Sequence, residues 1–493
     1  MPDPDEDVIA RRRQLVDGLR KIVPGEGVVV DEESLTAYDC DALSAYRQRP
    51  LAAVLPETVD QVAKILRLCK DLGVKIVPRG GGTSLSGGSL PVADGIILAM
   101  GRFNKIIEVD LPNRQARVQP GVTNLAISKA VDGDGFYYAP DPSSQIACSI
   151  GGNVSENAGG VHCLKYGMTS NNVLGVEFVT LEGDVIRFGG GYDQPGLDMM
   201  GLLVGSEGLL GVITEVTVRL LPKPETARAA LIGFPSNRSA ADAVGAIIAA
   251  GIIPAGMEMM DKPAIKVTED FVHAGYPLDV EALLIVELDG PKVEVDYLLV
   301  EVERICKENG ATTLQVSESE AQRLTFWAGR KAAFPAVGRI SRDYMTMDGT
   351  IPRGQLPDVL DHIDALAKKH GLGVANVFHA GDGNLHPLIL FDASIPGQLE
   401  AAEEFGADIL RKCVAVGGVL TGEHGVGIEK RDLMSVQFSE VDLIQQRRLK
   451  DVFDPYGIFN PGKVFPLLHR CVEGGRMIVS QGANAAFPDL PRF

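Results

Sequence analysis

The amino-acid sequence predicts an α+β fold made of two unlike halves, and two observations carry this prediction. Between residues 56 and 221, short apolar strands alternate with loops so rich in glycine that they cannot be ordinary connections. From residue 230 to residue 316 the hydrophobic pattern changes to strand, helix, strand, strand, helix, strand, which is the order of a ferredoxin-like split unit. We therefore expect a glycine-loop domain followed by a ferredoxin-like cap with a large antiparallel sheet.

The first half opens with a helix after Thr58, where Thr58 and Gln61 have the spacing of a capping box and apolar residues follow at helical intervals. A buried strand over 74–77 runs directly into the glycine-rich segment 78–88. Further strands are expected at 95–99, 173–181 and 212–221, and Pro222 and Pro224 then mark a boundary near residue 225.

In the second half we expect strands at 230–234, 255–260, 283–288 and 312–316, with helices at 239–250 and 295–309. A similar arrangement follows: strand 344–350, a helix entered at Pro357, and a hairpin over 373–391, so that two units would share one wide sheet. The stretch 440–465 looks helical. The expected domains are 1–49 (helical segment), 50–225 (glycine-loop domain), 226–440 (cap), 441–470 (helical return to the first domain) and 471–493 (tail).

Charge and cysteine content exclude several classes of function. The net charge of −18, from 65 acidic and 47 basic residues, disfavours nucleic acid and anionic membrane surfaces as partners. The seven cysteines form no CxxC pair, so neither a disulfide framework nor an iron–sulfur ligand set is expected. No apolar run is long enough to span a membrane. These features favour the reducing cytoplasm.

Three glycine segments, at 78–88, 149–160 and 204–214, are expected to serve one large ligand. Glycine lets backbone N–H groups approach an anion closely, so the first segment is suited to a pyrophosphate, although a tight structural turn is an alternative for that segment alone. It is not a P-loop, because Gly88 stands where the lysine should be, and Leu85 breaks the GxGxxG spacing.

These three segments, in this order, resemble the FAD-binding domain of the vanillyl-alcohol oxidase and para-cresol methylhydroxylase (PCMH) superfamily. The resemblance implies a two-part PCMH-type domain in which the first segment cradles the pyrophosphate, the second lies along the flavin and the third approaches the adenine. No histidine or cysteine occurs in 78–88, so FAD is expected to bind non-covalently. The implied FAD-binding residues are Pro78, Arg79, Gly80, Gly81, Gly82, Thr83, Ser84, Pro140, Asp141, Ser144, Gly151, Gly152, Asn153, Ser155, Asn157, Gly160, Tyr166, Gly167, Glu207, Gly208, Gly211, Ile213 and Asn460.

Three of the eight histidines fall in two short segments, and this concentration indicates a catalytic or metal-binding site. Asp382-Gly383 predicts a hairpin turn, and His379 and His386 lie three residues to either side, so we expect them to face one another across the ladder. With Glu423 they would form a two-histidine, one-carboxylate set for a divalent metal (zinc, manganese or iron) with an open position. His424 would then remain free as a base. A hydrogen-bonded network without metal is the alternative.

The same segments resemble the cap of the FAD-linked 2-hydroxy acid dehydrogenases, a family that includes D-lactate and D-2-hydroxyglutarate dehydrogenases and the FAD-binding subunit of glycolate oxidase. Segments 326–331 and 347–352 look closest to the glycolate oxidase subunit. By this resemblance Arg330 binds the substrate carboxylate, for which a guanidinium is suited, with a surface ion pair as the alternative. The implied reaction is oxidation of a small 2-hydroxy acid, glycolate first and D-lactate next, by hydride transfer to flavin N5.

The resemblance also implies partners. Because the sequence contains no iron–sulfur motif, electrons would leave through a flavoprotein-like subunit and an iron–sulfur subunit. The protein would be cytoplasmic, or held at the inner face of the membrane by a partner. The rival interpretations are a D-lactate or D-2-hydroxyglutarate dehydrogenase acting alone, a non-catalytic flavoprotein subunit, and a non-redox FAD enzyme such as an alkyl-glycerone-phosphate synthase.

Overall fold

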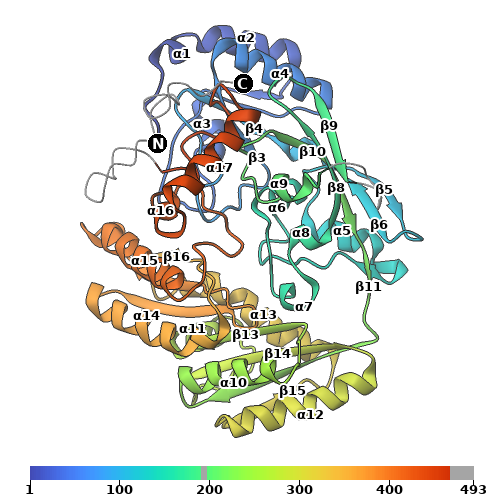
Figure 1. The fold of residues 1–493 in the computed structure, drawn as a ribbon, viewed down its shortest axis with the longest axis vertical. Coiled ribbons are helices and arrows are strands. Elements are labelled where there is room, and N and C mark those ends of the chain that lie inside the picture. Colours follow the sequence, from blue (N-terminus) through green and yellow to red (C-terminus); the bar gives the residue numbers. More distant parts are fainter. Residues whose placement is uncertain (190–196, 467–493) are drawn as a thin grey trace.

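A computed structural model describes residues 1–189 and 197–466. Figure 1 shows two parts: an upper one built from the N-terminal half, and a lower one built from the segments coloured yellow-green to orange. The last helices of the chain, in red, lie against the upper part. The tail expected at 471–493 lies outside the described residues. No helix within the described ranges is long and apolar enough to cross a membrane.

Two larger sheets and a two-stranded sheet of β7 and β11 build the described upper part. The first has the order β1-β2-β4-β3, with β2, β4 and β3 parallel, and the second is antiparallel with the order β5-β6-β10-β8-β9. The strands are β1 Val28–Val29, β2 Ala52–Val54, β3 Lys75–Arg79, β4 Gly95–Ala99, β5 Ile106–Asp110, β6 Gln115–Val118, β7 Phe136–Tyr137, β8 Val173–Val179, β9 Val185–Gly189, β10 Val212–Arg219 and β11 Leu221–Pro222. The helices are α1 Glu6–Ala10, α2 Arg12–Ile22, α3 Glu32–Leu35, α4 Val59–Leu72, α5 Asn124–Val131, α6 Ile150–Glu156, α7 Cys163–Tyr166, α8 Thr169–Asn172 and α9 Met200–Leu203.

Helix α4 forms as its sequence predicts. Thr58 and Gln61 make both bonds of the capping box, and the helix ends at Gly73 in the left-handed conformation. Its apolar stripe is buried against the first sheet together with α2. The glycine loop 80–88 therefore starts from a strand, β3, that is fixed on one face by a well-anchored helix.

The lower part is a single seven-stranded sheet with the order β15-β12-β14-β13-β17-β18-β16. Its first four strands have the neighbour order of a ferredoxin-like unit, which confirms the predicted topology, and the β13–β17 pairing joins the second unit to it. The strands are β12 Thr226–Phe234, β13 Gly256–Asp261, β14 Ala282–Gly290, β15 Thr313–Val316, β16 Asp343–Thr346, β17 Gly373–His379 and β18 Pro387–Phe391.

Helices cover both faces of this sheet. Helices α10 Asn237–Ala249, α12 Lys292–Glu308, α14 Leu356–His370 and α15 Gln398–Ala415 pack on one face, and α11 Lys262–Val272 and α13 Glu320–Val337 pack on the other. The sequence analysis missed α13 and α15, and it also missed α11. Its signal is the side chain of Asp261, which caps the helix, followed by Pro263 in the first turn.

The C-terminal segment connects the two parts. After α16 Met434–Gln437 and α17 Glu440–Phe453, residue Phe459 forms a parallel bridge with Ile76 of β3, and the N–H of Asn460 donates to the carbonyl of Ile76 at 2.7 Å. Helix α17 ends twelve residues before the predicted end at 465, because Asp454 turns the chain: its carboxylate accepts the N–H groups of Ile458 and Phe459. The chain thus returns beside the first glycine loop.

Candidate active site

A cavity of about 550 Å³ lies between the two parts and is lined by residues from both. One end is formed by the three glycine segments, and the other by helix α13, by Tyr344 and by the cluster of His379, His386, Glu423 and His424. The two groups of residues that the sequence singles out for separate reasons therefore share one space.

Most of the predicted cofactor residues line this cavity. In the first loop the approach of the chain is so close that a Cβ on Gly81 would lie 2.6 Å from the carbonyl oxygen of Ala147, so only glycine fits there without a backbone shift. Those in the lining are Pro78, Arg79, Gly80, Gly81, Gly82, Thr83, Ser84, Ser144, Gly151, Gly152, Asn153, Ser155, Glu207, Gly208, Gly211 and Ile213.

The other predicted cofactor residues lie outside the lining, and their direct contact with FAD stays a prediction. Tyr166 donates its hydroxyl to Asp289 of β14 at 2.6 Å, and Asp141 pairs with His162 at 2.9 Å. Asn460 donates from its amide to the carbonyls of Gly88 and Glu207 and so joins the first loop to the third. Also outside the lining are Pro140, Asn157, Gly160 and Gly167.

The histidine hairpin forms, but its register differs from the prediction. His379 pairs with Asn384, and Asn376 pairs with Pro387, so His379 and His386 are diagonal rather than direct neighbours. The turn between His379 and Asn384 is four residues long instead of two, which shifts the ladder by two positions. Because side chains alternate with a period of two, this shift leaves both histidines on one face. Their ring centroids lie 5.0 Å apart.

The predicted metal ligands converge. Nε2 of His379 lies 3.2 Å from Oε1 of Glu423, Nε2 of His386 lies 3.1 Å from the same oxygen, and one ligand atom from each residue falls within 4.8 Å of the others. The contact of His386 does not have hydrogen-bond geometry, and this buried Nε2 finds no other partner in residues 1–189 and 197–466. Two imidazoles and one carboxylate are a donor set that fits a divalent cation, and the binding of such an ion here stays a prediction.

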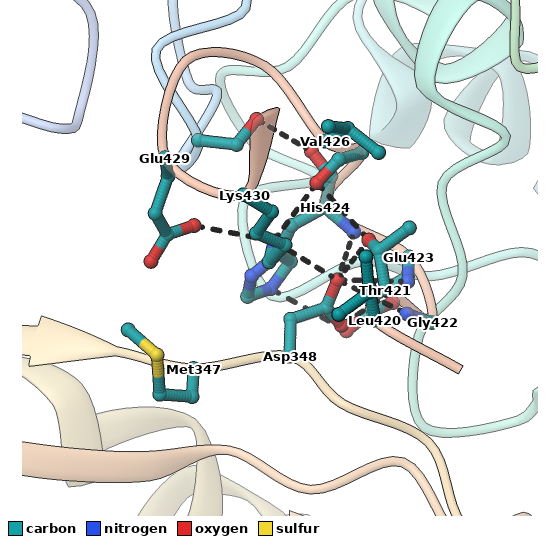
Figure 2. Close-up of polar contacts among 12 residues, drawn as sticks. Met347, Asp348, Leu420, Thr421, Gly422, Glu423, His424, Val426, Glu429 and Lys430 are labelled. Atoms are coloured by element: carbon teal, nitrogen blue, oxygen red, sulfur yellow. Dashed lines mark hydrogen bonds and ion pairs between the residues drawn. The ribbon is translucent and has the colours of Figure 1, made fainter. Parts of the chain in front are cut away.

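Glu423 and His424 lie on a turn that a buried carboxylate holds in place. Asp348, fully buried, accepts the N–H groups of Gly422, Glu423 and His424 at 2.8 to 3.1 Å from its backbone and side-chain oxygens, and also accepts the hydroxyl of Thr421. Figure 2 shows Asp348 against this turn, and Nζ of Lys430 lies 3.5 Å from its carboxylate. The direction of both functional side chains thus depends on Asp348.

A second carboxylate holds the turn from the opposite side. Glu207, in the third glycine loop, accepts the N–H groups of Val426 and Gly427, both at 2.8 Å. Between the two carboxylates, Gly425 adopts a φ of +81°, and a Cβ there would lie 2.1 Å from the carboxylate of Glu156. The turn therefore requires glycine at this position.

His424 lies in the cavity lining beside the predicted metal ligands, and its role as a base stays a prediction. Its ring stacks on His386 with centroids 4.8 Å apart, and its Nδ1 is buried with no hydrogen-bond partner in the described part of the chain. Burial lowers the pKa of His424 to about 4, so the imidazole is neutral near pH 7 and able to accept a proton. For His379 burial acts in the same direction, but the charges of Glu258 and Glu423 outweigh it and raise its pKa.

Arg330 lies on α13 and is 1% exposed, so the alternative of a surface ion pair is wrong. Its Nε donates to Oε2 of Glu258 at 2.7 Å, and its Nη1 is buried without a partner among the residues described. Arg330 lines the cavity, and a guanidinium with an unpaired outer nitrogen is suited to a carboxylate. Glu258 and Asp348 are the site residues that the sequence analysis missed.

These features define a class of protein: a flavin-dependent oxidoreductase with an FAD-binding domain and a separate substrate-side cap. Residues 50–189 match the FAD binding domain model, and residues 223–464 match that of the C-terminal domain of FAD linked oxidases. The chain belongs to the FAD-linked oxidase family.

Individual proteins support this assignment. The chain is 54% identical over 491 residues, 99% of its length and 97% of the relative's, to glycolate oxidase subunit GlcD of Escherichia coli K12. It is 40% identical to the GlcD subunit of Bacillus subtilis 168, covering 87% of this chain and 92% of that one. In fold it is similar to 4-ethylphenol oxidase from Gulosibacter chungangensis, with a TM-score of 0.79 at 19% identity over 94% of this chain and 98% of the other.

Proposed function

We propose that this chain is a FAD-dependent dehydrogenase that oxidises a small 2-hydroxy acid, glycolate first and D-lactate next, to the 2-oxo acid. The observation that carries the proposal is the single cavity, which brings the unpaired Nη1 of Arg330 and the cluster of His379, His386, Glu423 and His424 together with the FAD loops. A 2-hydroxy acid presents a carboxylate beside a hydroxyl, and the site offers one group for each. The names of the two GlcD relatives support glycolate.

Each residue then has a distinct task. Arg330 binds the carboxylate and so fixes the substrate carbon relative to the flavin. His424 takes the proton of the hydroxyl. Bound FAD supplies the two-electron acceptor. His379, His386 and Glu423 would hold a divalent ion (zinc, manganese or iron), which supplies Lewis-acid polarisation of the hydroxyl oxygen.

A dicarboxylic acid such as D-2-hydroxyglutarate is the second candidate substrate. Lys331 lines the same cavity beside Arg330, and its ammonium would suit a second carboxylate. D-2-hydroxyglutarate differs from glycolate only in the group attached beyond the reacting carbon. Measuring flavin reduction with each acid therefore distinguishes the two candidate substrates.

The test is the anaerobic flavin spectrum during addition of glycolate, D-lactate and D-2-hydroxyglutarate in turn, with and without a chelator. Bleaching by one acid, blocked by the chelator and restored by metal, is the expected result. A protein that retains FAD and metal but bleaches with none of the acids would instead be a supporting flavoprotein subunit.

The electrons would pass to partner subunits, because GlcD is named as one subunit of a larger oxidase. We expect a flavoprotein-like and an iron–sulfur subunit, with the assembly cytoplasmic or peripheral to the inner face of the membrane. Co-purification of the chain with such subunits from its native cells is the expected outcome, and reduction of an acceptor by the isolated chain at the rate of the complex would argue that it acts alone.

A further inference from the structure

Glu258, on β13, lies between the two groups that would contact the substrate and the metal. Its Oε2 accepts from Nε of Arg330 at 2.7 Å, and its Oε1 accepts from Nδ1 of His379 at 2.6 Å. The carboxylate is fully buried, and each oxygen has one partner. The β13–β17 pairing places Glu258 directly opposite His379, so the contact is built into the sheet.

Glu258 bonds one particular nitrogen of the Arg330 guanidinium, and this choice keeps the other edge available. Glu258 bonds the inner nitrogen, Nε, of this cavity-lining residue and leaves the outer Nη1 without a partner in the described chain. A carboxylate that bonded the two outer nitrogens as a fork would block the substrate. Glu258 therefore neutralises the buried charge and fixes the guanidinium plane without occupying its binding edge.

On the histidine side, Glu258 sets the tautomer. An ionised carboxylate only accepts hydrogen bonds, so Nδ1 of His379 carries the proton. Its Nε2, 3.2 Å from Oε1 of Glu423, is then the nitrogen that would give up its proton and offer a lone pair to a metal ion. A carboxylate that accepts from the outer nitrogen of a metal-ligating histidine typically tightens metal binding.

We propose that Glu258 is a positioning residue that holds the substrate-binding arginine and a metal-ligating histidine in one fixed geometry. This inference rests on the proposed function for the meaning of Arg330, but its histidine half concerns metal binding alone. One carboxylate sets the direction of the substrate carboxylate and the direction of the metal lone pair together, so the two cannot drift independently.

Glu258→Gln is the decisive variant, because glutamine has the same shape but only one accepting oxygen. The charged Nε of Arg330 can only donate, so it keeps that oxygen, and the amide N–H₂ then faces Nδ1 of His379. This forces the proton onto Nε2 and removes its lone pair. We expect Zn²⁺ affinity of the FAD-loaded protein, measured by competition with a chromophoric chelator, to fall about 10- to 100-fold. The KM for glycolate of the Zn²⁺-saturated variant should change less.

Glu287→Gln is the matched control. Glu287 is an equally buried carboxylate on the neighbouring strand β14, and it also bridges a histidine and an arginine, His162 and Arg323, but it lies outside the cavity lining. Its replacement should cost thermal stability and leave Zn²⁺ affinity nearly unchanged. An equal loss of Zn²⁺ affinity in both variants would overturn the inference, since it would reflect the loss of any buried charge.

Two further results would overturn it: wild-type Zn²⁺ affinity and wild-type KM together in the Glu258→Gln protein, or no Zn²⁺ binding by the wild type. If Glu258→Gln fails to retain FAD, Glu258→Asp replaces it, because a carboxylate one methylene shorter cannot reach both partners and should also weaken Zn²⁺. Zn²⁺ affinity needs no substrate. Suppose that Zn²⁺ affinity falls in Glu258→Gln but not in Glu287→Gln, and that no 2-hydroxy acid bleaches the flavin of the wild type. That result would uphold the role of Glu258 toward His379 and reject the proposed substrate.

Discussion

Replacing Asp348 by Asn removes the buried charge that holds the Glu423–His424 turn. In the folded protein, burial tends to raise the pKa of Asp348, but His424 and Lys430 outweigh it and lower the pKa from 3.8 to about 2. Because one pKa unit corresponds to about 1.4 kcal/mol, a shift of this size corresponds to about 2 kcal/mol of stabilisation from the ionised carboxylate. We expect Asp348→Asn to lose an amount of this order, since asparagine keeps the shape and one accepting oxygen.

The pH dependence of this loss has a definite sign. A carboxylate whose folded pKa is lowered contributes fully above its unfolded pKa and loses the contribution as pH falls through the folded value. Urea unfolding of wild type and variant should therefore differ most above about pH 4 and converge as the pH falls toward 2.

Thr421→Val is the graded control, because it removes only one donor to Asp348 and should cost about 1 kcal/mol. In Asp348→Asn, flavin reduction should also slow, since the turn carries His424. Equal unfolding free energies for wild type and Asp348→Asn at pH 7 would refute the reasoning, and so would a difference that does not depend on pH.

Three other changes test the site. His424→Ala should leave FAD bound and slow flavin reduction by about 100-fold or more, the contribution of a general base; bleaching at the wild-type rate in stopped flow would remove His424 from the mechanism. Arg330→Lys keeps the charge but loses the planar donor set, so the KM for glycolate should rise about 10-fold or more, and an unchanged KM would place the carboxylate elsewhere. Gly81→Ala adds a Cβ that would lie 2.6 Å from the carbonyl of Ala147, so the purified variant should hold less FAD per chain by absorbance; full occupancy would show that this loop can shift.

Local sequence signals predicted the elements that local interactions build. The capping box at Thr58 and the βαββαβ order both formed as expected, since each depends on residues close together in the chain. The histidine pair was placed on one face correctly, but its register was wrong, because a four-residue turn replaced the two-residue turn that Asp382-Gly383 indicates.

Local sequence signals could not predict the two carboxylates that hold the site residues in place. Glu258 lies 121 positions from His379, and Asp348 lies 76 positions from His424. Only the β13–β17 pairing and the return of the chain after α15 bring them together. An isolated glutamate in an apolar strand, as in 256–261, is the one signal that sequence offers, because a buried carboxylate requires a partner.

Carboxylates from both parts of the protein hold the turn that carries Glu423 and His424. Asp348 belongs to the cap and Glu207 to the FAD-binding part, and between them they take the N–H groups on either side of Gly425. The predicted metal ligands are divided in the same way, with His379 and His386 on the hairpin of the cap and Glu423 on the shared turn. An ion bound to these three residues would therefore link a turn that both parts hold to the cap sheet. If the predicted metal binds, a substitution that weakens the contacts between the two parts should lower metal affinity even where all three ligands are unchanged.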